Sequence, residues 1–222
     1  MPPGTSRFLS ESDSLDVLAA AGLPVVAHCL CDTIDDLIAA VRRFGTPVVV
    51  KACSSQLPHK SDYDLVVLNV DSEAAACAAG ALQRRTRALG VPLDGILVAE
   101  TGYGRHELML GARVDATFGP VLLVGDGGRC VEALRDTAVL LPPVSAQEVR
   151  DALSSLRVWP WLHSAEGDAV DVDAFCAAAV SLGRYITAAA DAVASVDVNP
   201  VLVGDAGHGI IVVDALIERA AR

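Results

Sequence analysis

The sequence has no apolar run approaching the roughly 18 residues that a membrane-spanning helix requires. Residues 1–10 also lack a basic stretch followed by an apolar core, which is the pattern of a secretory signal peptide. We therefore expect a chain that does not enter a membrane and that is not secreted. Cytoplasmic localisation is the default expectation.

Basic residues are scarce: 17 Lys and Arg stand against 28 Asp and Glu, which gives a formal net charge of −11. Proteins that bind nucleic acid need a basic surface to neutralise phosphates. The densest basic stretch, residues 84–87, falls within a helical pattern and is most simply a solvated helix face. The charge balance therefore predicts no nucleic-acid partner.

Several cofactor and metal motifs are missing as well. None of the six cysteines belongs to a C-x-x-C pair, so neither a zinc site nor a disulfide framework is expected. The chain contains no Walker A motif and no G-x-G-x-x-G dinucleotide fingerprint. Any nucleotide site must therefore be built in another way.

What the sequence does contain is an alternation of strand-like and helix-like segments in a chain of 222 residues, 52% of them hydrophobic. This order predicts an α+β domain, residues 1–222, with a smaller lobe at about 24–99 and a larger lobe made of 1–23 and 100–222. We expect strands near 25–30, 47–52, 65–70, 95–100, 107–114, 119–125, 195–203 and 209–214, and helices near 10–22, 32–45, 72–90, 127–135, 145–156 and 173–190.

The last two strands form the most informative pattern. A loop of about six residues between them predicts a hairpin that pairs Val203 with Ile210, Val201 with Val212 and Asn199 with Asp214. Directly opposite side chains lie roughly 5 Å apart at Cβ. The Asn199 amide oxygen and the Asp214 carboxylate would then converge as ligands for Mg²⁺. The alternative is a hairpin end with solvated polar groups.

Two further segments are candidates for phosphate contacts. Lys51 closes a buried strand, where a lysine is costly unless an anion meets it, although it could also reach water. The loop 58–62 gathers an imidazole, an ammonium group and a hydroxyl, and it is either a phosphate loop or an ordinary polar turn.

Two more candidates fall in the larger lobe. Glu107 alternates with apolar neighbours on its strand, so it points away from the buried face, toward a ligand or toward solvent. Gly127 and Gly128 follow an apolar strand and precede a helix, an arrangement that suits an anion.

Taken together, these features resemble the ATP-grasp domain of NDP-forming acyl-CoA synthetases, a group that includes ADP-forming acetyl-CoA synthetase and, more distantly, the succinyl-CoA synthetase beta subunit. The resemblance covers roughly residues 8–218. The motifs that carry it are residues 18–24, 45–51, 59–62, 107–111, 118–128 with 131–132, and 197–200 with Asp214.

The resemblance implies two α+β lobes that clasp ATP (or GTP) with Mg²⁺, and an enzyme that makes acyl-CoA, ADP and phosphate from an acid, CoA and ATP through phosphohistidine. It also implies a role for each matching residue: Asn199 and Asp214 as metal ligands, His59 as a phosphoryl relay, and Lys51, His59, Lys60, Ser61, Glu100, Glu107, Gly127 and Gly128 as nucleotide contacts. A CoA-binding and ligase subunit of alpha type is the implied partner, with a small carboxylic acid and CoA as substrates.

The chain departs from the family pattern after residue 62. Members usually have a small residue and paired glycines there, whereas this chain has Tyr63, Asp64 and Leu65. Added bulk and negative charge at a phosphate loop predict weaker nucleotide binding. Two alternatives follow: a non-catalytic grasp subunit that serves assembly or regulation, and a stand-alone ligase that joins a carboxylate to an amine.

Overall fold

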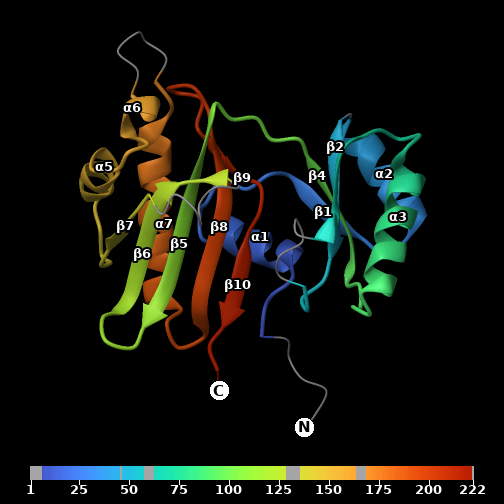
Figure 1. Ribbon diagram of the computed structural model, residues 1–222, viewed down its shortest axis with the longest axis horizontal. Helices are drawn as coiled ribbons and strands as arrows, with labels where there is room; N and C mark the ends of the chain where they lie inside the picture. Colours follow the sequence, from blue (N-terminus) through green and yellow to red (C-terminus); the bar gives the residue numbers. More distant parts are fainter. Residues whose placement is uncertain (1–6, 46, 58–62, 129–135, 164–168, 222) are drawn as a thin grey trace. The chain divides into compact units, whose positions relative to one another are not determined.

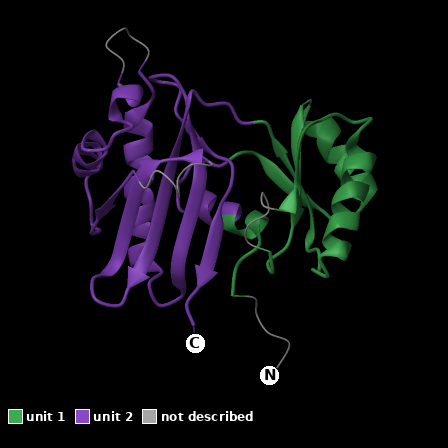
Figure 2. Ribbon diagram, viewed as in Figure 1, with its two compact units in different colours: residues 1–14, 26–101 green, residues 15–25, 102–222 purple. Residues whose placement is uncertain are grey.

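The computed structural model describes residues 7–45, 47–57, 63–128, 136–163 and 169–221. The chain divides into two compact units, residues 1–14 with 26–101 and residues 15–25 with 102–222 (Figure 2). This division assigns residues 1–14 to the smaller unit, whereas the sequence analysis placed them in the larger lobe. Both units combine helices with antiparallel sheets, so the expected α+β class is confirmed.

The smaller unit is built on a four-stranded antiparallel sheet of order β1-β4-β2-β3. Two helices, α2 and α3, lie along one face of this sheet (Figure 1) and bury a core of Leu, Val and Ala side chains against it. The elements of this unit are α1 (Glu11–Ala20, which continues into the larger unit), β1 (His28–Cys31), α2 (Ile34–Phe44), β2 (Val48–Cys53), β3 (Val66–Val70), α3 (Ala75–Ala88) and β4 (Gly95–Glu100).

Helix α2 shows how local sequence fixes these elements. Thr33 caps its N-terminus, because the hydroxyl accepts a hydrogen bond from the Asp36 amide at 3.1 Å. Leu37 and Val41 lie one turn apart and are fully buried against the sheet. Gly45 ends the helix at a φ of +82°, a conformation that a residue with a Cβ rarely adopts.

The larger unit is built on a six-stranded antiparallel sheet of order β10-β8-β5-β6-β7, with β9 also paired to β8. Helix α7 packs on β5, β6 and β8, and α5 packs on α7, β6 and β7 (Figure 1). The elements are β5 (His106–Asp115), β6 (Gly119–Asp126), β7 (Thr137–Leu140), α5 (Ala146–Ser154), α6 (Trp159–Leu162), α7 (Val172–Ala188), β8 (Val193–Val203), β9 (Ile210–Val212) and β10 (Leu216–Arg219).

One side chain ties α7 to the terminal hairpin. Asp171 caps α7 by accepting a hydrogen bond from the Ala174 amide, and its second carboxylate oxygen accepts one from the Gly209 amide at 2.8 Å. Helix α7 then buries Phe175 and Leu182 against the sheet. The sheet that carries the site residues is thus supported on one face by the buried side of α7.

Most expected elements are present, and three were missed. The strands β7 and β10 and the short helix α6 lie in segments for which the sequence analysis expected no regular structure. The helix expected at 127–135 falls largely on residues 129–135, which lie outside the described part of the chain. Within the described residues, no helix has the length and apolarity needed to cross a membrane.

Candidate functional site

The terminal strands pair in the predicted register. Val203 is paired with Ile210 and Val201 with Val212, so these two predictions are confirmed. Beyond β9 the same edge of β8 pairs with β10, where Asp197 is opposite Leu216. Asn199 lies midway between Asp197 and Val201 in β8. Asp214 lies midway between their partners, Val212 and Leu216. Continued across the interruption between β9 and β10, the register on each side agrees with the predicted placement of Asn199 opposite Asp214, which stays a prediction.

A bulge in β8 shapes the same position. On the β5 side, Leu108 is paired with Val201 and Leu110 with Val198, so two residues of β8, Asn199 and Pro200, stand opposite one residue of β5. Proline cannot donate to a sheet ladder, and a bulge is one of the few places in a sheet that accept it. A bulge also redirects the side chains next to it. Asn199 consequently leaves the alternation of β8 and meets the turn that follows β6.

That turn is formed by Gly127 and Gly128. The Gly128 amide donates a hydrogen bond to Asn199 Oδ1 at 2.9 Å, and Asn199 Nδ2 donates to the Gly128 carbonyl at 3.4 Å. The Gly127 amide donates to the Glu107 carbonyl at 3.0 Å. The structure thus brings together three of the predicted elements, the glycine pair, Glu107 and Asn199.

Both glycines are required by the close approach of β5. A Cβ on Gly127 would lie 2.5 Å from the carbonyl carbon of Leu108. Gly128 has a φ of +77°, and a Cβ there would overlap the Glu107 carboxylate. The exposed Glu107 side chain therefore lies against the turn, as expected for a strand residue that points away from the buried face.

A pair that the sequence analysis did not single out borders the turn. His106 Nε2 lies 3.0 Å from Asp126 Oδ1, and the same oxygen accepts a hydrogen bond from the Gly127 amide at 3.2 Å. In the sequence, His106 has no other histidine or cysteine at a metal-ligand spacing. Its link to Asp126 is a contact across 20 residues, for which the local sequence gives no signal.

In the smaller unit, Lys51 forms a buried ion pair. Its ammonium group lies 2.6 Å from Glu11 Oε1, and the two side chains are 9% and 1% exposed. Ser10, Ser12, Ser14 and Ser54 are also buried. The sequence analysis missed Glu11 as a partner, since the contact spans 40 residues.

The remaining predicted residues of the smaller unit are spread out. Glu100 ends β4, is exposed, and donates its amide to the Ala27 carbonyl. His59, Lys60 and Ser61 lie outside the described residues, so their roles stay predictions.

The expectation that Leu65 crowds a phosphate loop is wrong. Leu65 is fully buried in the core of the smaller unit, and its carbonyl accepts a hydrogen bond from the Ala52 amide. Asp64 has a φ of +52°, a conformation that glycine adopts readily. Compared with the glycines of the family pattern, this chain thus has an aspartate at position 64 and a buried core side chain at position 65.

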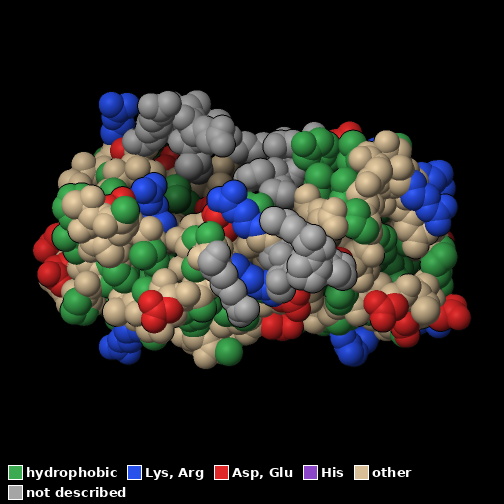
Figure 3. Space-filling model, turned by 90° about the horizontal axis from the view of Figure 1, so that it is seen from below, with side chains coloured by type: hydrophobic (Ala, Val, Ile, Leu, Met, Phe, Trp, Pro, Cys, Tyr) green, Lys and Arg blue, Asp and Glu red, His purple; other side chains and the backbone are tan. Residues whose placement is uncertain are grey.

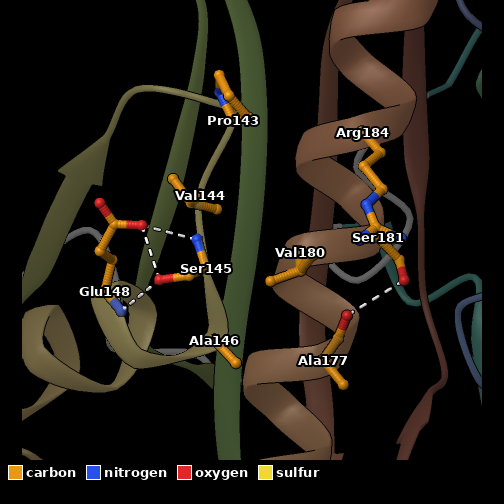
Figure 4. Close-up of a pocket in the computed structure, with 9 residues that line it drawn as sticks. All are labelled: Pro143, Val144, Ser145, Ala146, Glu148, Ala177, Val180, Ser181 and Arg184. Carbon is orange, nitrogen blue, oxygen red and sulfur yellow. Dashed lines mark hydrogen bonds between the residues drawn. The ribbon is translucent and has the colours of Figure 1, made fainter.

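Two other surface features contain none of the predicted site residues. A pocket of about 760 Å³ lies between the start of α5 and α7, where Ser145 and Glu148 form a capping box (Figure 4). On the face shown in Figure 3, the described basic side chains are interspersed with acidic and apolar ones. Neither feature adds a ligand to the cluster around Gly128.

The oxygen atoms of Asn199 and Asp214 suit a hard cation that is also coordinated by the phosphates of a bound nucleotide. An amide oxygen has two lone pairs, and the Gly128 amide uses one of those on Asn199 Oδ1. Asn199 and Asp214 carry one amide oxygen and one carboxylate, the kinds of oxygen ligand that Mg²⁺ takes when phosphates and water complete its octahedron. Among the described residues no group of three His, Cys, Asp or Glu could hold a metal alone.

The buried cysteines Cys31 and Cys176 offer no alternative chemistry. All five described cysteines are free thiols. Burial, with a smaller contribution from Cys29, raises the pKa of Cys31 to about 12, and burial raises the pKa of Cys176 to about 11. Protonated, buried thiols are poor nucleophiles.

The fold and the cluster together define a nucleotide-binding class of protein, and comparison with known proteins agrees. The family model described as an ATP-grasp domain matches residues 4–218. The chain belongs to the ATP-grasp family.

The relatives share a more specific chemistry. The chain is 36% identical over 218 residues to trans-feruloyl-CoA synthase FCS1 of an unknown prokaryotic organism, covering 96% of this chain and 30% of that protein. It is 30% identical over 211 residues to subunit beta of acetate–CoA ligase [ADP-forming] II of Pyrococcus furiosus, covering 93% of this chain and 89% of the subunit. Its relatives thus include domains and subunits of ADP-forming acid–CoA ligases.

A solved structure shows the same architecture. Acetyl-coenzyme A synthetase 1 of Ca. Korarchaeum cryptofilum, in complex with coenzyme A and Mg-AMPPCP, is 29% identical to this chain with a TM-score of 0.82. The match covers 96% of this chain and 93% of that one. That complex has its phosphohistidine segment pointing towards the nucleotide binding site.

Proposed function

We propose that this chain is the nucleotide-binding component of an ADP-forming acyl-CoA synthetase, which converts a carboxylic acid, CoA and ATP into acyl-CoA, ADP and phosphate. The single observation that carries the proposal is the cluster of Glu107, Gly127, Gly128 and Asn199, with Asp214 predicted to lie opposite Asn199. The named ADP-forming relatives favour ATP over GTP as the nucleotide.

Each part of the cluster has a distinct task. The turn at Gly127–Gly128 is assigned to the nucleotide and holds Asn199 through two hydrogen bonds, and Glu107 borders it as a nucleotide contact. Asn199 and Asp214 would hold Mg²⁺, which neutralises charge on the phosphates when it is bound. Because phosphoryl transfer depends chiefly on positioning and charge neutralisation, these residues are the larger unit's share of the proposed nucleotide site.

The smaller unit contributes the remaining phosphate contacts in this proposal. Lys51, the loop residues His59, Lys60 and Ser61, and Glu100 at the end of β4 are assigned to the nucleotide. His59 is assigned as the residue that relays the phosphoryl group. The buried pair with Glu11 keeps the Lys51 ammonium charged, because the carboxylate offsets the cost of burial.

The synthetase activity needs more than this chain supplies. The chain spans 30% of the length of the feruloyl-CoA synthase and 89% of the Pyrococcus furiosus beta subunit. We assign the CoA-binding and ligase functions to an alpha-type partner subunit, and the small carboxylic acid and CoA to the assembled enzyme.

The test is an activity measurement on the assembled enzyme. The tagged chain is purified from its native host with whatever subunit accompanies it, and ADP release from Mg·ATP is measured. The proposal predicts release that requires both CoA and a carboxylic acid, and that is lost when Asp214→Ala is carried through the same purification. ADP release that needs an amine instead of CoA would contradict it, as would a chain that binds no nucleotide.

A further inference from the structure

The His106–Asp126 pair connects two strand ends at the proposed nucleotide site. His106 begins β5 and Asp126 ends β6, and their side chains are 27% and 22% exposed. A single carboxylate oxygen, Asp126 Oδ1, lies 3.0 Å from the imidazole Nε2 and 3.2 Å from the Gly127 amide. The imidazole is therefore joined to the glycine turn through one atom.

Three sets of hydrogen bonds hold the Gly127–Gly128 turn, and the one to Asp126 belongs to the His106–Asp126 pair. Gly127 also donates to the Glu107 carbonyl, and Gly128 is bonded to Asn199 at both its amide and its carbonyl. No Cβ would fit at Gly127, so the turn lies directly against β5. Any shift of the turn would move Asn199, because two hydrogen bonds couple them.

A negatively charged residue such as Asp126 is unexpected next to a proposed phosphate site. A carboxylate directly before an anion-binding turn repels phosphate, and Glu107 already lies on the other side of the turn. An apolar residue would avoid this repulsion. What the position gains from the carboxylate is an acceptor, because Asp126 Oδ1 lies 3.0 Å from His106 Nε2 and accepts a hydrogen bond from the Gly127 amide.

We propose that His106 and Asp126 are positioning residues that hold the Gly127–Gly128 turn, and through it Asn199, in the geometry that binds the nucleotide phosphates. The proposal rests on the proposed function for its ligand, whereas the ordering of the turn belongs to the nucleotide-free chain. Neither residue touches the reacting atoms in this account.

The experiment has two arms on the purified full chain. The first measures amide hydrogen exchange at Gly127 and Gly128 by NMR without nucleotide, and the second measures the Kd for Mg·ATP by calorimetry. His106→Leu and Asp126→Leu remove the pair. His106→Gln and Asp126→Asn keep a donor at the Nε2 position and an acceptor at Oδ1.

A matched control is available in the adjacent exposed ion pair. Asp205 lies 2.9 Å from Arg105, the residue before His106, and their side chains are 51% and 40% exposed. Asp205→Asn removes a more exposed carboxylate of the neighbouring ion pair without touching the turn.

The leucine variants should speed exchange at the two glycine amides and raise the Kd for Mg·ATP, each about three- to tenfold, the usual worth of one hydrogen bond. The glutamine and asparagine variants and Asp205→Asn should stay within about twofold of the wild type. Circular dichroism identifies any variant that does not fold. If one leucine variant does not fold, the leucine variant at the other position of the pair decides.

Unchanged exchange in the leucine variants would overturn the proposal, as would faster exchange with an unchanged Kd. An equal effect of Asp205→Asn would also overturn it, because the effect would then be one of general charge. If the wild type binds no Mg·ATP, the proposed function fails, while the exchange arm still decides whether the pair orders the turn.

Discussion

Breaking the Lys51–Glu11 pair separates what Lys51 does for the fold from what it does for a ligand. Lys51→Met takes the ammonium group away from the Glu11 carboxylate, whose side chain is 1% exposed. Removing one partner of a buried pair costs about 3–5 kcal/mol in the free energy of unfolding. Replacing both partners in Glu11→Leu/Lys51→Met leaves no buried charge, and such replacements are often neutral.

Nucleotide affinity should not follow stability in this series. A charge-assisted hydrogen bond contributes about 1.5–3 kcal/mol, so the loss of the lysine should raise the Kd for Mg·ATP about 10- to 100-fold. This loss should remain in the double variant even though its stability recovers. The two quantities are measured by urea unfolding and by calorimetry.

An exposed cation provides the control. Arg105→Met breaks the exposed pair with Asp205 and should cost less than about 1 kcal/mol. A loss below about 1 kcal/mol for Lys51→Met would refute the reasoning on burial. A double variant with wild-type affinity would refute the assignment of Lys51 to the phosphates.

Three further predictions concern the fold. Asp64→Val should lose about 1–2 kcal/mol in urea unfolding, because a β-branched side chain fits poorly at a φ of +52°, whereas Asp64→Gly should change stability by less than about 1 kcal/mol. At pH 8 the exposed Cys77 should react with an alkylating reagent before Cys176, whose pKa is about 11, and equal rates by mass spectrometry would contradict the burial of Cys176. Hydrogen bonds from the Ser145 amide and hydroxyl lower the pKa of Glu148 below its ordinary value of 4.5, so the stability it adds is present above that value and is lost as the pH falls through the lowered pKa. The melting temperatures of wild type and Glu148→Gln should therefore differ at pH 7 and converge in acid.

Patterns of short sequence range predicted much of the fold. The alternation of apolar residues in β8 and β9 predicted the pairing of Val203 with Ile210, since a slip by one residue would expose the buried set. Strand β10 escaped notice because it has only four residues and a register shift between Glu218 and Arg219. Short segments of this kind carry little periodic signal.

Site residues could be proposed from the sequence only where a local sequence pattern marks them. Gly127 and Gly128 stand out in the sequence because they follow an apolar strand, and their nucleotide role stays a prediction. The partnerships of Glu11 with Lys51 and of His106 with Asp126 could not be, because each depends on contacts over 40 and 20 residues that folding creates. Leu65 was misjudged for the same reason, since its burial depends on the packing of the whole smaller unit.

The central claim is that Asn199 and Asp214 hold a divalent cation together with a nucleotide. Its most direct test is calorimetric titration of ATP into the purified chain, with Mg²⁺ and then with Mg²⁺ removed by a chelator, for the wild type, Asn199→Ala and Asp214→Ala. The account predicts saturable binding for the wild type with Mg²⁺ and its loss in the other cases. Equal affinity in the variants, or binding that does not depend on Mg²⁺, would contradict the account.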